Sequence, residues 1–493
     1  MVELHMEIPF KMIRDFAKGQ PVFFAGGPVR DWLLGRYASD IDMVVPHGAV
    51  EVAHKLARQT GGGFVLLDQG EDVARVVIQG ISFDLSGFRK NAKSIQEDLS
   101  FRDFTINAMA VPMDAVSGSI RVTEKGIVAP RKDCIKFLID PFGGWHDLEK
   151  KAIRPVALEN MREDPLRLLR AFRFRAVLGF FIQADLQEFI RSESRLITRS
   201  APERINYELE RLLETGLAGQ SLREMFDLGL LRQILPELKE MEGVEQPGFH
   251  HLDVLGHCFE AVSCMDKLIM DPCTRFSNCK VFQEWLSKNP SRTPYLKWAA
   301  FMHDFGKPSQ KDIRQDGRVT FYNHDRKGAE MAAEIASRLR WSRSSTSFVK
   351  RLVRMHMRPF HLLNDLRKGG PSKRALRKLL EEIGPDYPAL FLLSMADSMA
   401  GCGPLKPQGL DDELSRLFDK VHEFYLKRLI PVKKAPPLLN GKDVMKLFSI
   451  RPGPLVGQAL RAVEARRVEG FIKTREQAIA WLKAHFPDEL SVS

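Results

Sequence analysis

FFAGGPVRDWLLGRYASDIDMVV, residues 23–45, is the stretch that decides the fold. Its pattern predicts a short strand, a glycine turn, a helix, and then a second strand over 41–45. Because Gly26 and Gly27 have no Cβ, backbone N–H groups in this turn can approach a phosphate at the start of the helix. Arg30 adds a guanidinium whose geometry suits phosphate oxygens. The stretch therefore predicts a phosphate-binding turn.

Two aspartates enter the second strand of this stretch. Asp40 and Asp42 are two positions apart, so both carboxylates lie on one face of the strand while Ile41 and Met43 point into the core. Carboxylates this close repel each other unless a cation lies between them, and hard oxygen ligands near phosphates favour Mg²⁺. We predict magnesium-dependent nucleotidyl transfer with Asp40 and Asp42 as catalytic residues and metal ligands. The pair alone would also suit two solvated aspartates after a loop.

The whole stretch resembles the signature of the class II tRNA nucleotidyltransferase and bacterial poly(A) polymerase family. That signature is Gly-Gly-x-Val-Arg-Asp-x-Leu-Leu-Gly followed by Asp-x-Asp, and every position of it is present here. The resemblance implies an α+β fold: a polymerase-β-like nucleotidyltransferase head, then an all-α neck, an HD-like body and a helical tail. It also implies template-independent addition of C and/or A residues (CCA or CC) from CTP and ATP to the 3′ end of tRNA, with release of pyrophosphate. Poly(A) synthesis is the alternative within the family.

Composition bounds the class of protein. The 493 residues suffice for several domains, and 44% hydrophobic with 28% charged residues is ordinary for a soluble chain. A net charge of +11 indicates a polyanionic partner, either nucleic acid or an acidic membrane face. No apolar run reaches the roughly 20 residues of a membrane span, and the N-terminus has no signal-peptide core, so we expect a cytoplasmic protein. The six cysteines form no Cys-x-x-Cys pair, which predicts neither a disulfide framework nor a zinc finger.

The predicted domains follow changes in pattern along the chain. We expect the head over 1–137, a helical neck and body with the base-recognition helix over 138–242, an HD-like metal phosphohydrolase domain over 243–405, and a helical tRNA-binding tail over 406–493. Strand-like runs in the head include two joined by Gln79-Gly80 as a hairpin. Asp84 in the second of these alternates onto one face, where it is either a third carboxylate near the metals or a solvated edge residue.

The segment EDLSFRDFTINA, residues 97–108, is predicted to be a helix. It resembles the family motif Arg-Arg-Asp-Phe-Thr-Ile-Asn-Ala, with Phe101 in place of the first arginine. By that resemblance Arg102 and Asp103 contact the ribose and triphosphate; from the residues alone, a structural ion pair explains them equally well. The link over 86–96 is short, and a shortened loop here resembles the family members that add only CC.

The segment REDPLRLLRAFRFRAVLGF, residues 162–180, is predicted to be one strong helix. At i and i+3, Asp164 and Arg167 would lie side by side on its surface, which by itself is usually a helix salt bridge. The match to the family motif Glu-Asp-x-x-Arg implies instead that Asp164 and Arg167 read the incoming base and that Arg170 steadies the triphosphate. The predicted apolar stripe of this helix comprises Leu166, Leu169, Phe172, Val177 and Leu178.

A second cluster of possible ligands begins near residue 243. Neighbouring His and Asp side chains can form a mixed N/O site for a divalent metal that polarises phosphate esters. Together they resemble the HD phosphohydrolase superfamily, which implies a site for Mg²⁺ or a divalent transition metal. The ligands implied are His257, His303, Asp304 and Asp397, with His324 and His356 as additional ligands. A function of another class therefore stays open, namely an HD-type phosphohydrolase or phosphodiesterase with a nucleotide-sensing head.

Basic residues are dense between Arg338 and Lys378, where Asp365 is the one aspartate. A solvated helix face usually alternates in sign, so this stripe favours contact with an RNA backbone. The resemblance implies tRNA as the partner, bound at its 3′ end and at its elbow by the C-terminal tail. Neither DNA nor a membrane is an expected partner.

Overall fold

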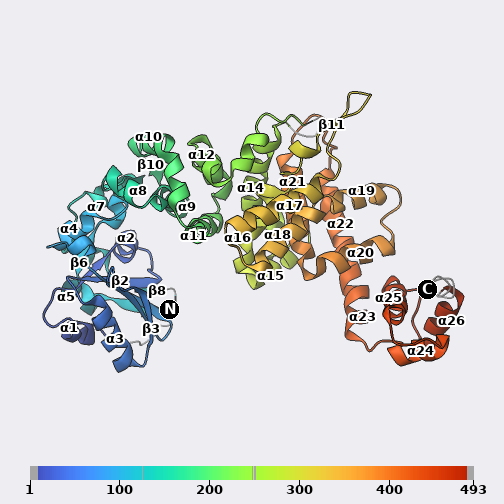
Figure 1. Ribbon diagram of the computed structural model, residues 1–493, viewed down its shortest axis with the longest axis horizontal. Helices are drawn as coiled ribbons and strands as arrows, with labels where there is room; N and C mark the ends of the chain where they lie inside the picture. Colours follow the sequence, from blue (N-terminus) through green and yellow to red (C-terminus); the bar gives the residue numbers. More distant parts are fainter. Residues whose placement is uncertain (1–8, 125, 247, 249–250, 486–493) are drawn as a thin grey trace. The chain divides into compact units, whose positions relative to one another are not determined.

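The computed structural model describes residues 9–124, 126–246, 248 and 251–485 (Figure 1). The chain divides into two compact units. The first takes the residues up to Leu212 together with Glu224–Ile234, and the second takes Leu213–Arg223 together with the chain from Leu235 onward. The finer division into four domains, with boundaries near 137, 242 and 405, stays a prediction.

The head is built on a mixed six-stranded sheet in the order β3-β4-β5-β2-β1-β6. The strands are β1 (Phe23–Ala25), β2 (Asp40–Val45), β3 (Gly63–Asp68), β4 (Val73–Ile78), β5 (Ile81–Gly87) and β6 (Ala110–Pro112). β2 and β5 run parallel, and the other neighbours are antiparallel. The predicted hairpin is confirmed, because Gln79 and Gly80 both have positive φ (50° and 85°), as a two-residue type I′ turn requires.

Helices of the first unit flank the sheet and continue into the neck. In the head they are α1 (Phe10–Phe16), α2 (Gly27–Leu33), α3 (Ala49–Thr60), α4 (Ile95–Ser100), α5 (Met113–Val116) and α6 (Arg131–Lys136), with a small hairpin of β7 (Arg121–Thr123) and β8 (Gly126–Val128). The neck comprises α7 (Gly144–Lys150), β9 (Ala152–Ile153), α8 (Leu158–Glu163), α9 (Leu166–Leu178), β10 (Phe181–Ile182), α10 (Ala184–Glu193), α11 (Pro202–Leu213), part of α12 (Ala218–Asp227) and α13 (Leu230–Ile234).

The predicted single helix over 162–180 is wrong, because the structure has two helices, α8 and α9, with a break between them. Pro165 has no N–H and disfavours a helical residue before it, and Asp164 accordingly takes an extended conformation (φ −128°, ψ 90°). The predicted apolar stripe is also wrong at Val177, which is 44% exposed. α9 ends at Leu178, and the Gly179 that follows it has φ 73°, the left-handed conformation common at helix ends.

The predicted helix over 97–108 is also wrong beyond its first half. α4 ends at Ser100, and a single 3₁₀ turn covers Thr105–Asn107. Between them Phe104 is extended, forms a β-bridge with Pro155, and packs edge-on against Phe174 with ring centroids 5.6 Å apart. Burial of this ring against the neck outweighs the local helical preference, so Arg102 and Asp103 lie in a turn.

The second unit is helical apart from the short β11 (Asp312–Ile313) and β12 (Val319–Thr320). Its main helices are α14 (Val254–Met270), α15 (Lys280–Lys288), α16 (Thr293–Met302), α17 (His324–Arg338), α18 (Arg343–Met355), α19 (Arg358–Arg367), α20 (Lys373–Ile383), α21 (Tyr387–Ala400), α22 (Leu410–Phe424) and α23 (Ile430–Lys434). α24 (Gly441–Phe448), α25 (Pro454–Glu469) and α26 (Arg475–His485) share a small core of their own. α16 and α21 are almost wholly buried, which explains their near-continuous apolar sequence.

Two expectations about the surface change in the structure. Cys273 and Cys279 form a disulfide, so the prediction of no disulfide is wrong for this pair. The basic stripe over 338–378 draws acidic partners from distant segments, such as Arg338 with Glu237, Arg351 with Asp386, and Arg367 with Glu413. These acidic residues lie outside the basic stripe in the sequence, so the sequence pattern did not reveal that they neutralise part of its charge.

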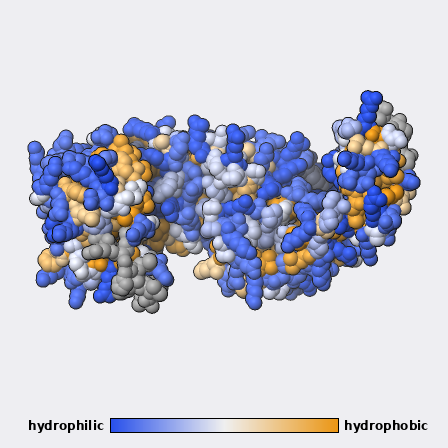
Figure 2. Space-filling model, turned by 90° about the horizontal axis from the view of Figure 1, so that it is seen from below, coloured by the Kyte–Doolittle hydropathy of each residue, from blue (hydrophilic) through white to orange (hydrophobic). Residues whose placement is uncertain are grey.

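The face of the molecule in Figure 2 is largely hydrophilic, with hydrophobic side chains in limited patches. Within the described ranges no helix is both long and apolar enough to cross a membrane.

Candidate active site

Three carboxylates meet where β2 and β5 run side by side. The parallel register pairs Asp42 with Asp84 and Asp40 with Ser82. One carboxylate oxygen from each of Asp40, Asp42 and Asp84 lies within 4.8 Å of the others, and we call these three residues the acidic cluster. Ile41 is fully buried behind them, as the period-two pattern predicts. The expected pairing of Asp40 and Asp42 on one face is confirmed, and Asp84 joins them.

The electrostatics of the acidic cluster fit a divalent cation. Burial, then the charges of Asp40 and Asp84, raise the pKa of Asp42 to about 7. Arg75 donates two hydrogen bonds to Asp84, at 2.6 and 2.7 Å, so its direct contacts are with the outer carboxylate of the cluster. Concentrated negative charge in a half-buried set of oxygen ligands is the environment that a hard cation relieves.

The glycine turn and Arg102 lie beside the acidic cluster. Gly26 has φ +78°, and a Cβ added there would come 2.6 Å from Nη1 of Arg102 and 3.7 Å from Oδ2 of Asp42. Gly26 donates its own N–H to the carbonyl of Met109, so the amide that can face a ligand in this turn is that of Gly27. Nε of Arg102 is buried and has no hydrogen-bond partner, and the adjoining glycines leave room for an anionic ligand.

A chain of polar contacts links the glycine turn to α9. Arg30 donates to Asp31 at 2.9 and 3.0 Å and to Oδ1 of Asn107 at 2.8 Å. Asn107 in turn donates to Asp103 at 3.0 Å, and the other oxygen of Asp103 lies 2.9 Å from Nη2 of Arg170. Arg30 therefore orders the turn, since much of its donor capacity is used within the protein. Arg170 favours the charged form of the buried Asp103 and lowers its pKa, although burial opposes this.

The predicted pair on α9 does not form a helix-surface salt bridge. Asp164 precedes α9 and accepts hydrogen bonds from Arg204 of α11 at 3.3 and 2.9 Å. Arg167 donates to the carbonyl oxygens of Asn160 and Phe101, each at 3.0 Å, and its buried Nε has no hydrogen-bond partner. The structure thus excludes the ordinary helix-surface pairing of Asp164 with Arg167.

In the second unit, five helices or helix ends bring the six predicted metal ligands together. We call these six residues the HD cluster. They come from α14 (His257), the end of α16 (His303, Asp304), the start of α17 (His324), the end of α18 (His356) and α21 (Asp397). His257, His303 and Asp304 form one possible metal-binding group, and Asp304, His324 and His356 form another. Oδ1 of Asp397 lies 3.0 Å from Nε2 of His257 and 3.6 Å from Nε2 of His303, beside the first group. Asp304 therefore serves both groups.

Backbone carbonyls orient three of these imidazoles. Nδ1 of His303, His324 and His356 lies 2.8, 2.7 and 2.7 Å from the carbonyl oxygens of Ala300, Phe321 and Val353, respectively. Because each carbonyl accepts a hydrogen bond from Nδ1–H, Nε2 is the ring nitrogen that faces the cluster and can bind a metal through its lone pair when the imidazole is neutral. The segment after α16 can approach the start of α17 closely because Gly306 has no side chain. A Cβ at Gly306 would lie 2.2 Å from the carbonyl oxygen of His324.

The buried charges of the HD cluster perturb its side chains strongly. Burial opposes protonation of His303, but Asp304 and Asp397 raise its pKa to about 10. Burial and the neighbouring His324 and His303 lower the pKa of His356 to about 3. Lys307 contacts Asp304 at 2.6 Å. Two carboxylates and four imidazoles in one buried site fit divalent metals that accept nitrogen and oxygen ligands.

Comparison with known proteins identifies the family. An A-adding tRNA nucleotidyltransferase of Deinococcus radiodurans is 32% identical over 469 residues, which cover 93% of this chain and 94% of that protein. The chain belongs to the tRNA nucleotidyltransferase family. A CC-adding tRNA nucleotidyltransferase of Thermus thermophilus is 31% identical and covers 97% of this chain and 95% of that protein.

Family models and solved structures match the same tRNA nucleotidyltransferase architecture. A poly(A) polymerase head domain model matches residues 22–154, an HD domain model matches 286–398, and a model of tRNA nucleotidyltransferase domain 2 matches 412–482. Residues 179–242 match a model described as "Probable RNA and SrmB- binding site of polymerase A". The Thermotoga maritima CCA-adding enzyme complexed with tRNA has a TM-score of 0.59 at 21% identity over 97% of this chain and 94% of that chain. A CCA-adding enzyme complexed with ATP has a TM-score of 0.61 at 21% identity over 98% and 94%, respectively. The predicted fold class is confirmed.

Sequence reasoning missed two residues that organise this candidate site. Asn107 bridges Arg30 and Asp103, and Glu208 of α11 lies within ion-pair distance of Arg170 and Arg173. No sequence spacing marks Asn107 or Glu208 as a site residue, because only the tertiary structure brings each of them next to its partners. Because a buried charge without a partner is costly, the sequence indicates that each buried arginine of α9 needs an acceptor, but it does not say which residue supplies it.

Proposed function

We propose that the chain transfers nucleotides from CTP and/or ATP to the 3′ end of tRNA, with Asp40 and Asp42 as catalytic residues and with release of pyrophosphate. The observation that carries this proposal is the acidic cluster beside the glycine turn and the unpartnered Nε of Arg102. Such an enzyme would act in the cytoplasm, where tRNA is matured.

The proposed mechanism depends on positioning and charge. Asp40 and Asp42, with Asp84 beside them, would hold Mg²⁺, which when bound lowers the pKa of a hydroxyl nucleophile and offsets phosphate charge. Gly26 and Gly27 leave room for the triphosphate, and Arg102 donates to its oxygens or to the ribose. Asp103 and Arg170 hold the neighbouring wall in place, and the 3′ hydroxyl of the RNA is aligned with the α-phosphate.

Base choice would fall to Asp164 and Arg167, without a template strand. Arg167 offers donors and Asp164 offers acceptors, which together can mimic a Watson–Crick partner for C or A. The arginine contacts with the carbonyls of Phe101 and Asn160 would fix the orientation in which its remaining donors meet the base. Arg204 would do the same for Asp164.

The link between β5 and α4 supports CC addition as the product. It runs only from Phe88 to Ser94 and is anchored by the fully buried Asp98, which accepts from the backbone N–H of Arg89 at 2.9 Å and from its guanidinium. A short, anchored link is the feature that resembles CC-only members. CCA addition, A addition and poly(A) synthesis are the other products to test.

The deciding experiment uses tRNA lacking its 3′ CCA, incubated with labelled CTP, ATP or both and sized at single-nucleotide resolution. Two added cytidylates and no adenylate would support CC addition. Asp42→Ala should abolish incorporation while tRNA binding is kept. Asp133→Ala, which removes an acid of the same unit outside the acidic cluster, is the matched control. Full incorporation by Asp42→Ala would contradict the proposal.

We also propose a second activity, phosphoester hydrolysis at the HD cluster with divalent metals, because Asp304 is shared between two possible metal-binding groups. Its test is hydrolysis of para-nitrophenyl phosphate and its bis ester with Mg²⁺, Mn²⁺ or Ni²⁺. Asp304→Ala should remove hydrolysis and leave nucleotide incorporation intact. Loss of both activities together, in a variant that stays folded, would contradict separate sites.

A further inference from the structure

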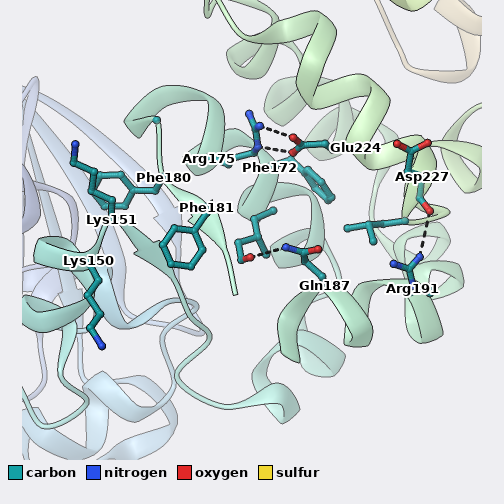
Figure 3. Close-up of a pocket in the computed structure, with 13 residues that line it drawn as sticks. Lys150, Lys151, Phe172, Arg175, Phe180, Phe181, Gln187, Arg191, Glu224 and Asp227 are labelled. Carbon is teal, nitrogen blue, oxygen red and sulfur yellow. Dashed lines mark hydrogen bonds and ion pairs between the residues drawn. The ribbon is translucent and has the colours of Figure 1, made fainter. Parts of the chain in front are cut away.

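Two features of the first unit lie outside the proposed mechanism. One is a pocket of about 690 Å³ in the neck (Figure 3). Most of its lining comes from the segment that matches the model of a probable RNA-binding site. The side chains of Lys150 and Lys151 point in opposite directions there, so they do not form a single anion site. The other feature is the free edge of the head sheet, which β3 (Gly63–Asp68) forms.

β3 is the end strand of the six-stranded sheet. It pairs with β4 on its inner side, and within the described ranges no strand pairs with its outer side. Every residue of β3 is exposed, including four large hydrophobic ones: Phe64 (36%), Val65 (47%), Leu66 (46%) and Leu67 (48%). Successive side chains of a strand point to opposite faces, so β3 exposes apolar groups on both faces of the sheet. An edge strand of this kind is a template for pairing with another strand.

β3 lacks the features that usually prevent such pairing. Proteins commonly protect an edge strand with a lysine, a proline or a bulge. The run from Gly63 to Leu67 contains no charged residue and no proline. The pairing of β3 with β4 shifts register between Leu66 and Asp68, which is at the end of the strand and leaves the apolar run regular. The edge is therefore suited to being covered by a partner.

Opposite charges flank the two ends of β3. Arg58 lies in the last turn of α3 and precedes the strand, whereas Asp68 ends the strand and Glu71 follows it. Arg58 and Glu71 are both exposed, and neither has an ion-pair partner among the residues that the structure describes. If two copies of β3 pair antiparallel, the start of each strand lies beside the end of the other. Arg58 of each copy would then lie near the acidic end of the other copy, so two-fold symmetry makes the contact twice.

We propose that β3 pairs antiparallel with β3 of a second copy of the chain, which joins the two head sheets across a two-fold axis. The edge is complementary to itself in charge and in hydrophobic character, which favours a second copy over a peptide of unrelated sequence. A strand of this length spans only about 20 Å, so the interface is small. Small interfaces belong to the weak class, and we expect a reversible dimer that forms at micromolar concentration.

Dimer formation at β3 should leave nucleotide transfer unchanged. β4 and β5 lie between β3 and β2, the strand that carries Asp40 and Asp42. A partner strand on the outer side of β3 therefore extends the sheet away from the acidic cluster. The proposal goes beyond the proposed function and does not depend on it.

The test is sedimentation velocity of the full chain over a concentration range of about 1–100 µM. The wild type should shift from monomer to dimer as its concentration rises. Leu66→Lys should raise the dissociation constant by about tenfold or more, because a lysine on an edge strand opposes pairing. Ile135→Lys is the matched control, since Ile135 is a 42% exposed residue of α6 in the same unit. The control should dimerise as the wild type does.

A charge exchange tests the antiparallel orientation. Arg58→Glu should raise the dissociation constant about tenfold, because it brings like charges together at both ends of the interface. Adding Glu71→Arg to the same chain should restore the dissociation constant of the wild type. These positions are exposed, so neither change removes a buried contact, and circular dichroism checks that each variant is folded.

A wild type that stays monomeric over the whole range would overturn the proposal, whether another segment of the chain or another protein covers the edge. Equal dissociation constants for Leu66→Lys and Ile135→Lys would overturn it too. So would a dimer of Arg58→Glu that Glu71→Arg does not restore. Because the readout is molecular mass, a failure of nucleotide incorporation would count against the proposed function alone and would leave these outcomes intact.

Discussion

Replacing Asp42 with asparagine should stabilise the metal-free protein while abolishing nucleotide incorporation. Burial and two neighbouring carboxylates raise the pKa of Asp42 from 3.8 to about 7. Ionising this group in the folded chain at pH 8 therefore costs about 4 kcal/mol, since each tenfold change in an equilibrium constant is about 1.4 kcal/mol. Asparagine removes the charge and keeps the size of the side chain, so most of that cost should disappear.

The sign of the pH dependence follows from the raised pKa. Below about pH 4 the carboxyl is protonated in both the folded and unfolded chains, and the variant should gain nothing. The advantage of Asp42→Asn should grow as pH rises through the interval between 3.8 and about 7 and then level off.

The assay is thermal unfolding in EDTA and in Mg²⁺ at several pH values. In EDTA at pH 8 the variant should unfold at a higher temperature than the wild type. Mg²⁺ should raise the midpoint of the wild type more than that of the variant, because the cation binds the native acidic cluster. A variant that is less stable in EDTA, or an equal response to Mg²⁺ in both proteins, would refute the reasoning.

Three further outcomes are expected. Gly27→Ala should fold normally, because a Cβ there meets Oδ2 of Asp42 at an ordinary 3.7 Å, yet it should lower incorporation by crowding the turn; unchanged kinetics would exclude a ligand close to this position. Arg170→Ala should raise the KM for CTP about tenfold, with a smaller change in kcat, because Asp103 loses its cation; an unchanged KM would leave Arg170 with a structural role alone. Lys297→Met should lower the free energy of unfolding by about 3–5 kcal/mol in a urea titration, because the buried Asp266 loses its ion-pair partner at 2.6 Å; a loss below 1 kcal/mol would show that water replaces the lysine.

Short-range geometry made much of the head predictable. A period of two places Asp40 and Asp42 on one face whatever the rest of the chain does, and the two-residue hairpin fixes the β4–β5 register that pairs Arg75 with Asp84. The parallel pairing of β2 with β5, which brings Asp84 beside Asp42, is a tertiary contact that the hairpin does not determine. The HD cluster could be predicted as a set of residues, because its histidines and aspartates resemble the ligand pattern of the HD phosphohydrolase superfamily. Its division into two groups around Asp304 could not, since that depends on how five helices pack.

Tertiary contacts explain the errors. The break at Asp164 was signalled by Pro165, but a proline in the first turn of a helix is also common, so position alone did not decide between the two outcomes. Phe104 leaves the helical conformation because its ring packs against the neck, and no local pattern encodes that partner. The basic stripe lost part of its free charge to Glu237, Asp386 and Glu413, which lie outside its own stretch of sequence.

The carboxylate of Asp103 has a bearing on attempts to redesign nucleobase preference. It is tied through Asn107 to the arginine that orders the glycine turn and directly to Arg170 on α9. In the proposed mechanism, tilting α9 to admit a purine analogue would pull on the glycine turn where we place the phosphates, so gains in selectivity for the base would come with losses in turnover. These contacts favour a different design strategy, in which side chains at the N-terminal end of α9 are exchanged and the helix axis is not moved.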